Sequence, residues 1–179
     1  MHLIEYTILT GFLFVIFGGL FLFGNLSVKS KFVSFPRSRL LSYILMTIGT
    51  CWFLLGHVMQ LGEADFGNYK HIITMLSICI LVSAFFFTKD FLAVRALSII
   101  TLLYSREVLD SAFLQEPSAR LLLVSVVYVM ILVALYLGAY PYRMRDFFLF
   151  IYGQGRRNKY LGGCFMLCGL SLLLSVLAY

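Results

Sequence analysis

The stretch FLAVRALSIITLLYSREVLDSAFL, residues 91–114, indicates what kind of protein this chain forms. It is apolar over a length sufficient to cross a membrane as a helix, which takes about 20 residues. Near its carboxyl end it carries Arg106, Glu107 and Asp110. Charged side chains at membrane depth are costly and are rarely left unpaired. The stretch therefore predicts a membrane helix, and it marks a place where polar residues could serve a function.

The composition extends this prediction to the whole chain of 179 residues. Hydrophobic residues make up 61% of it and charged residues only 12%, with a mean hydropathy of +0.96. A water-soluble domain has about a quarter of its residues charged, so the surrounding medium is predicted to be lipid. The basic residues behind the net charge of +6 fall mostly in the gaps between apolar runs, where membrane proteins place their cytosolic anchors. We therefore expect membrane lipid as a partner and no nucleic acid.

Six apolar runs are long enough to be transmembrane helices. None shows the alternation of a barrel strand, and helices satisfy their backbone hydrogen bonds within the lipid. A shorter apolar segment, 146–152, is predicted to lie on the cytosolic surface of the membrane. The sequence thus predicts an all-α, multi-pass membrane protein in which residues 1–179 form one membrane domain without a soluble domain. The six predicted spans are residues 3–24, 40–61, 71–88, 91–114, 121–140 and 160–179.

The gaps between these runs predict the orientation of the chain. The second and fourth gaps hold Lys70 and Arg120 as their only basic residues. Cytosolic loops carry an excess of Lys and Arg, so we expect the other three gaps to be cytosolic and both termini extracytosolic, in an inner (plasma) membrane. The first run carries Glu5 where a cleaved signal peptide has a basic residue, and it is expected to remain as a span. The basic residues of the first, third and fifth gaps are Lys29, Lys31, Arg37, Arg39, Lys89, Arg143, Arg145, Arg156, Arg157 and Lys159.

Polar residues expected in the outer half of the bundle form the candidate site. Asp110 follows Arg106 by four residues, which suits an ion pair on one helix face. One hypothesis is a polar pocket that could hold an anionic headgroup, a carboxylate or a small acid. A second is that Arg106 and Asp110 form a structural clamp between helices, with Glu107 at the headgroup level, and a third is a snorkelling surface. The residues of the predicted pocket are His57, Tyr104, Arg106, Glu107, Asp110 and Tyr128.

The sequence predicts no metal, cofactor or catalytic site. His57, Glu63, Asp65 and His71 lie in or beside one loop and carry ordinary ligand groups, but their spacing matches no metal motif. The catalytic patterns G-x-S-x-G and H-E-x-x-H are missing from the sequence. A membrane enzyme or haem carrier that depends on His57 stays open as an alternative.

Small residues recur on one side of three predicted spans. In lipid such stripes let helices approach closely, and they serve internal packing and contact with a partner equally well. Cysteines in these stripes are interpreted as small packing residues rather than as soft-metal ligands. The stripes are Thr7, Gly11 and Gly18 in the first run, Gly49 and Gly56 in the second, and Cys164, Cys168, Ser171 and Ser175 in the last.

Together these observations favour a non-enzymatic integral membrane protein. Short loops, few charges within the spans and no catalytic motif suggest a subunit, or an assembly or accessory component, of a membrane complex with other membrane-protein subunits. The alternative is a small transporter, or a lipid- or anion-binding membrane protein, whose site is the polar pocket around Arg106.

Overall fold

The computed structural model describes residues 3–23, 26–62, 66–87, 90–116, 118–153 and 156–178. Every regular element in these ranges is helical and none is a strand, which confirms the all-α prediction. The elements are α1 (Leu3–Phe23), α2 (Leu26–Ser34), η1 (Phe35–Arg37), α3 (Arg39–Phe53), η2 (Leu54–Val58), η4 (Gly67–Tyr69), α4 (Lys70–Phe87), α5 (Leu92–Ala112), α6 (Arg120–Ala139), α7 (Tyr142–Gly153), α8 (Arg157–Ser175) and η5 (Val176–Ala178).

Within the described residues, four helical stretches are long and apolar enough to cross a membrane. They are Leu3–Phe23, Arg39–Val58, Gly67–Phe87 and Arg120–Ala139. Helices α5 and α8 have a similar length, 21 and 19 residues, and lie where the two other spans are predicted. Their lower apolar character has a simple cause, because α5 contains four charged residues and α8 opens with Arg157, Asn158 and Lys159.

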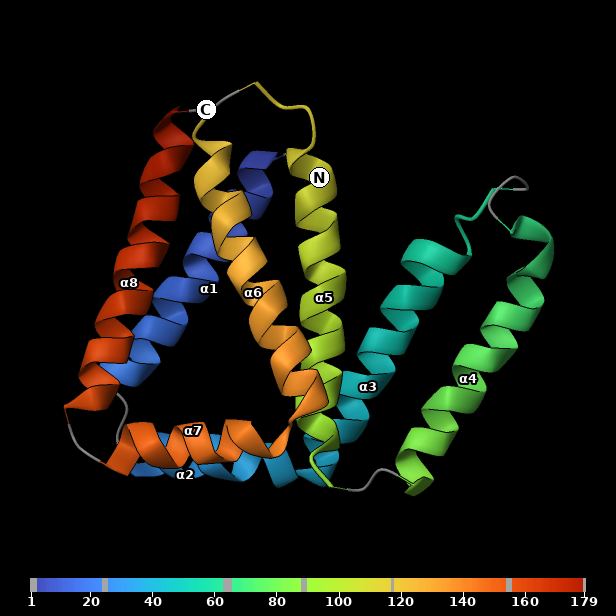
Figure 1. Cartoon of the computed structure of the whole chain (residues 1–179), viewed down its shortest axis with the longest axis horizontal. Helices are drawn as coiled ribbons and strands as arrows, with labels where there is room; N and C mark the ends of the chain where they lie inside the picture. Colours follow the sequence, from blue (N-terminus) through green and yellow to red (C-terminus); the bar gives the residue numbers. More distant parts are fainter. Residues whose placement is uncertain are drawn as a thin grey trace.

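The long helices form two tight pairs, α1 with α8 and α5 with α6 (Figure 1). The pairs meet at one end of the molecule, where the start of α1 lies against the end of α5, and they splay apart toward the other end. We call the first end the apex and the second the base. The main core of buried residues fills the apex: Leu3, Tyr6, Tyr104, Val108, Ala112, Leu123, Val127 and Leu172.

Glycine pairs explain how α1 and α8 come so close. A Cβ built on Gly18 would lie 2.9 Å from the carbonyl oxygen of Gly162, and a Cβ on Gly162 would lie 2.9 Å from that of Gly18. The pair Gly11 and Gly169 repeats the arrangement two turns away, with distances of 3.2 and 2.8 Å. No side chain fits between backbones at this spacing, so the predicted small face of α1 is confirmed at both its glycines.

The stripe of small residues predicted on α8 does not pack against α1, and its contact with a partner stays a prediction. Cys164 and Cys168 are exposed, and the hydroxyl of Ser171 bonds to the carbonyl oxygen of Cys168 in an exposed position. The packing face is instead the one that carries Gly162 and Gly169. The reason is steric, since even the small cysteine side chain would hold the two helix backbones apart.

Two short helices, α2 and α7, lie side by side across the base (Figure 1). The predicted interfacial segment 146–152 is part of α7, which is longer and includes basic residues at its start. Helix α2 lies in what the sequence presents as a polar gap and was not predicted. Aromatic rings join both short helices to the end of α1: the ring of Phe32 lies 5.3 Å from those of Phe21 and Phe148, centroid to centroid.

Helix α4 stands apart from the rest of the molecule (Figure 1). It packs against α3 and η2 but not closely, and none of its residues, all of which are described, is buried. The clearest contact is at the base, where the rings of Tyr43 and Phe85 meet edge to face at 4.7 Å. Three apolar side chains near the end of α4 are partly buried against the contact between α3 and α5: Leu81, Ala84 and Phe85. Most of the other large apolar side chains of α4 are exposed.

Candidate functional site

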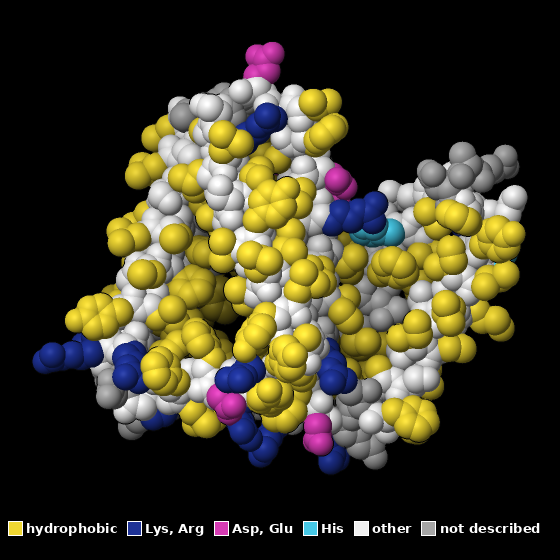
Figure 2. Space-filling view, viewed as in Figure 1, with side chains coloured by type: hydrophobic (Ala, Val, Ile, Leu, Met, Phe, Trp, Pro, Cys, Tyr) yellow, Lys and Arg dark blue, Asp and Glu magenta, His cyan; other side chains and the backbone are white. Residues whose placement is uncertain are grey.

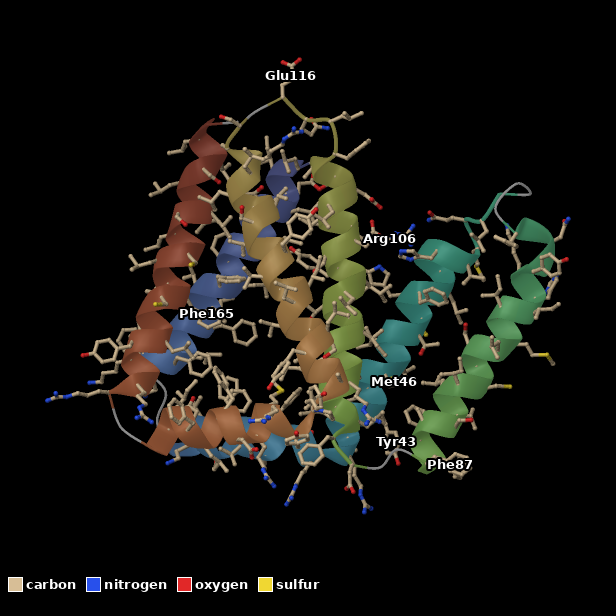
Figure 3. The ribbon with its side chains drawn as sticks, viewed as in Figure 1. Tyr43, Met46, Phe87, Arg106, Glu116 and Phe165 are labelled. Carbon is tan, nitrogen blue, oxygen red and sulfur yellow. The ribbon has the colours of Figure 1, made fainter. Side chains whose placement is uncertain are left out.

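The six residues of the predicted pocket do not all come together. Four of them lie where η2 faces the carboxyl-terminal third of α5: His57, Arg106, Glu107 and Asp110. Arg106 extends from α5 toward α3, as labelled in Figure 3. The other two, Tyr104 and Tyr128, lie on different faces of the bundle.

Tyr104 points from α5 toward α1 and not toward Arg106. Its hydroxyl lies 2.7 Å from that of Thr10, and its ring meets the ring of Tyr6 at 6.0 Å in an edge-to-face arrangement. Two residues along a helix turn the side chain by about 200°, which places Tyr104 and Arg106 on opposite faces. Tyr128 is 56% exposed on α6. Neither tyrosine therefore belongs to the cluster around Arg106.

His57 and Glu107 make the ionisable contact between helices. The Nε2 atom of His57 lies 3.8 Å from Oε1 of Glu107, and the two side chains are 8% and 34% exposed. The ring of Phe53, one helical turn earlier, stacks on the imidazole with the two ring centroids 6.0 Å apart. No described group bonds to the buried Nδ1 atom of His57. The histidine thus contacts both an aromatic ring and a carboxylate.

The backbone at His57 departs from the α-helix. Residues Leu54–Val58 form a π turn, in which the amide of Met59 donates to the carbonyl oxygen of Leu54 at 3.0 Å. Such a turn widens the helix by one residue, and it often occurs at functional sites. Here it lies where α3 would otherwise continue as a regular helix, and it places His57 opposite α5. The apolar sequence of this segment gives no signal for the change in hydrogen bonding.

Arg106 and Asp110 form an ion pair along one helix. Their Nε and Oδ2 atoms are 3.7 Å apart, and the side chains are 62% and 70% exposed. The predicted i, i+4 pairing is present, but it does not join two helices as the clamp hypothesis requires. Exposed pairs of this kind contribute about 0–1 kcal/mol in water. The contact between helices comes instead from Glu107, which that hypothesis placed at the headgroup level.

The residues considered for a metal do not form a site in the described part of the chain. His71 is exposed at the start of α4, and Glu63 and Asp65 lie outside the described residues. No group of three or more His, Cys, Asp or Glu side chains there is arranged to hold a metal ion.

An apolar groove separates α4 from α3 and α5, and no sequence pattern predicts it. It has a volume of about 180 Å³ and is lined by both small and large side chains. A smaller pocket of about 130 Å³ lies nearer the base between α3, α4 and α5 and includes Arg39 and Tyr43. Helix α4 is apolar around its whole circumference, so its sequence does not mark one face for packing. The groove is lined by Leu45, Met46, Gly49, Thr50, Phe53, Ser77, Ile80, Ala96 and Ile99.

Comparisons with protein-family models, with curated proteins and with solved structures find no match for this chain. The function is therefore inferred from the chain's own geometry. Two features stand out: the groove beside α4, which is suited to apolar contact, and the cluster around His57 and Glu107, which is suited to polar contact.

Proposed function

We propose that this chain is a non-enzymatic, six-span protein of the inner (plasma) membrane that acts as a subunit or assembly component of a membrane complex. Helices α5 and α8 complete the six spans of this proposal, as the fourth and sixth spans in chain order, beside the four more apolar stretches. The predicted positive-inside pattern puts the base in the cytosol and the apex outside, with both termini extracytosolic. The basic residues of α2, α7 and the start of α8 support this orientation, since all belong to the base.

The observation that carries the proposal is the incomplete packing of α4. A transmembrane helix gains stability in lipid from close packing with other helices, yet α4 has no buried residue and leaves an open groove beside it. Phe53 of α3, Ile80 of α4 and Ile99 of α5 give the groove apolar walls. The occupant that fits is a transmembrane helix of another protein, which presents large aliphatic or aromatic side chains to the groove.

Purification with a partner tests this function. The tagged full chain, extracted in a mild detergent, should bring down a stoichiometric membrane partner. Ile80→Trp should fill the groove and reduce recovery of that partner, because Ile80 lines the groove. Ile78→Trp is the matched control: it is the same change on α4, about 200° around the helix from Ile80, at a similarly exposed position. Recovery of a stable chain without any partner, or equal loss in both variants, would reject the groove as the binding surface.

A second candidate function is the small transporter, or lipid- or anion-binding protein, with its site at Arg106. It is favoured by the π turn that presents His57 to α5, and by the buried Nδ1 atom of His57 that no described group satisfies. Uptake of labelled acetate into proteoliposomes is a direct assay. Arg106→Gln should abolish uptake while Arg95→Gln leaves it intact, and equal uptake by both variants would remove this candidate.

A further inference from the structure

The base of the molecule combines an apolar hollow with a concentration of positive charge. Figure 2 shows the hollow between α8 and α6, above α7, with apolar side chains in its depth. Phe165, labelled in Figure 3, extends from α8 toward this space, and its ring lies 5.3 Å from that of Phe14 on α1. Below the hollow, Phe21 and Phe148 are buried where α1 meets α7. The hollow is therefore apolar on its sides and at its floor.

The helices that form the floor are strongly basic. Their sequences contain one acidic residue, Asp146. Its carboxylate accepts hydrogen bonds from the guanidinium of Arg145, with an N–O distance of 2.9 Å. No other acidic residue on these helices neutralises the remaining basic side chains. Figure 2 shows basic side chains along the base. Seven basic residues lie in α2, in α7 and at the start of α8, counting Arg156 directly before it: Lys29, Lys31, Arg143, Arg145, Arg156, Arg157 and Lys159.

Polar atoms are buried without a described partner where α1, α2, α7 and α8 meet. They are the hydroxyl of Tyr152 and the Oδ1 atom of Asn158. Both residues lie against Phe21: the ring of Tyr152 is 6.2 Å from the ring of Phe21, and the Nδ2 atom of Asn158 donates to its carbonyl oxygen at 3.3 Å. Lys29 reaches the same corner, where its ammonium donates to the carbonyl oxygen of Tyr152 at 3.3 Å.

These groups have the chemistry to recognise a phosphate diester that also carries a hydroxyl. The ammonium of Lys29 has further hydrogens to donate after its bond to Tyr152. Burial raises the pKa of the Tyr152 hydroxyl, so this group stays protonated and can donate to a phosphate oxygen. The bond from Asn158 to a backbone carbonyl fixes its amide nitrogen as the donor, which leaves Oδ1 to accept from a headgroup hydroxyl. Unsatisfied buried polar groups are costly, and such a ligand would satisfy both of them.

We propose that this corner of the base binds an anionic phospholipid of the cytosolic leaflet, with its phosphate at Lys29 and Tyr152, its headgroup hydroxyl at Asn158 and its acyl chains in the hollow between α8 and α6. The site is independent of the groove beside α4, which lies on the other side of α5 (Figure 1). It differs from general attraction between basic loops and anionic lipid, because it depends on particular side chains rather than on the number of charges.

Native mass spectrometry of the full chain in a mild detergent tests the site. The chain is mixed with phosphatidylglycerol or with phosphatidylcholine of the same acyl composition, and the bound fraction is measured. We expect phosphatidylglycerol to bind preferentially. Lys29→Gln and Tyr152→Phe should each weaken its binding about five-fold, the loss expected for one nearby charge or one hydrogen bond. Lys29→Arg should retain it, which excludes a general loss of folding.

Matched controls separate the site from surface charge. Lys31 is an exposed residue two positions further along α2, and Tyr160 is an exposed tyrosine in α8. Lys31→Gln and Tyr160→Phe should leave phosphatidylglycerol binding unchanged. The proposal is overturned if Lys31→Gln has the same effect as Lys29→Gln, or if phosphatidylcholine binds equally well. It is also overturned if inorganic phosphate at equal concentration displaces the lipid, which would show a free-phosphate site instead.

Discussion

Gly18 offers the sharpest test of the packing between α1 and α8. A Cβ at this position would lie 2.7 Å from the backbone nitrogen of Met166 and 2.9 Å from the backbone oxygen of Gly162. Ordinary contacts between heavy atoms are at about 3.5–4.0 Å. Because both neighbours are backbone atoms, no rotation of a side chain relieves the overlap. In Gly18→Ala the helices must separate by roughly 0.5–1 Å, the shortfall from normal contact distance.

The expected cost follows from two opposing effects. Overpacking of this kind costs about 1–3 kcal/mol, whereas replacing glycine by alanine within a helix returns up to about 1 kcal/mol. The separation also loosens the second crossing at Gly11 and Gly169, because the two contacts share the same pair of helices. We therefore expect Gly18→Ala to lower the free energy of unfolding by about 1–2 kcal/mol.

The adjacent Gly19 provides the control, since a Cβ there would meet no heavy atom within 4 Å. Gly19→Ala should be neutral or slightly stabilising. Stability is measured in detergent micelles by titration with sodium dodecyl sulfate, with helicity followed by circular dichroism. The double variant Gly18→Ala, Gly162→Ala should cost less than the sum of the single changes, because the first already separates the helices. If Gly18→Ala is as stable as Gly19→Ala, close backbone contact at Gly18 does not limit the packing of α1 against α8.

Three further predictions concern the cluster, the apex and the orientation. Tyr104→Phe removes the hydroxyl contact to α1 and should lower the free energy of unfolding by about 1 kcal/mol, while Tyr128→Phe, measured by the same titration, should change nothing. Arg106→Ala should alter the free energy of unfolding by less than about 0.5 kcal/mol, since its ion pair is exposed and lies within one helix; a larger loss would revive the structural clamp. Ser118→Cys should react with a membrane-impermeant maleimide on intact cells and Ser34→Cys only after permeabilisation, and the reverse result would invert the proposed topology.

The positions of the helices could be predicted because hydrophobic length is a local property of the sequence. Helix α2 escaped prediction because Lys29 and Lys31 make its segment resemble a polar loop. Its position depends on Phe32, whose ring packs on Phe21 and Phe148 from other helices. That contact is tertiary, and neither the charge pattern nor the length of the segment carries information about it.

The contacts of the candidate site could also be predicted only in part. Sequence spacing predicted the pairing of Arg106 with Asp110, because both residues lie on one helix. It also placed Tyr104 and Tyr128 at a similar depth, but depth says nothing about the direction in which a helix face points. The contact between His57 and Glu107 depends on the rotation of α5 and on the π turn in η2. Both are set by packing between helices and not by residue spacing.

The glycine contacts between α1 and α8 also have a consequence for biogenesis. The glycines of α1 find their partners only after the helices between them have been synthesised and inserted. At typical translation rates of about 5–20 residues per second, α1 waits on the order of 10 s in the bilayer with this face uncovered. During that interval a chaperone or another nascent chain can occupy the glycine surface. The speed of ribosomal elongation, and not the strength of the final contact, would then determine how much of the chain assembles correctly.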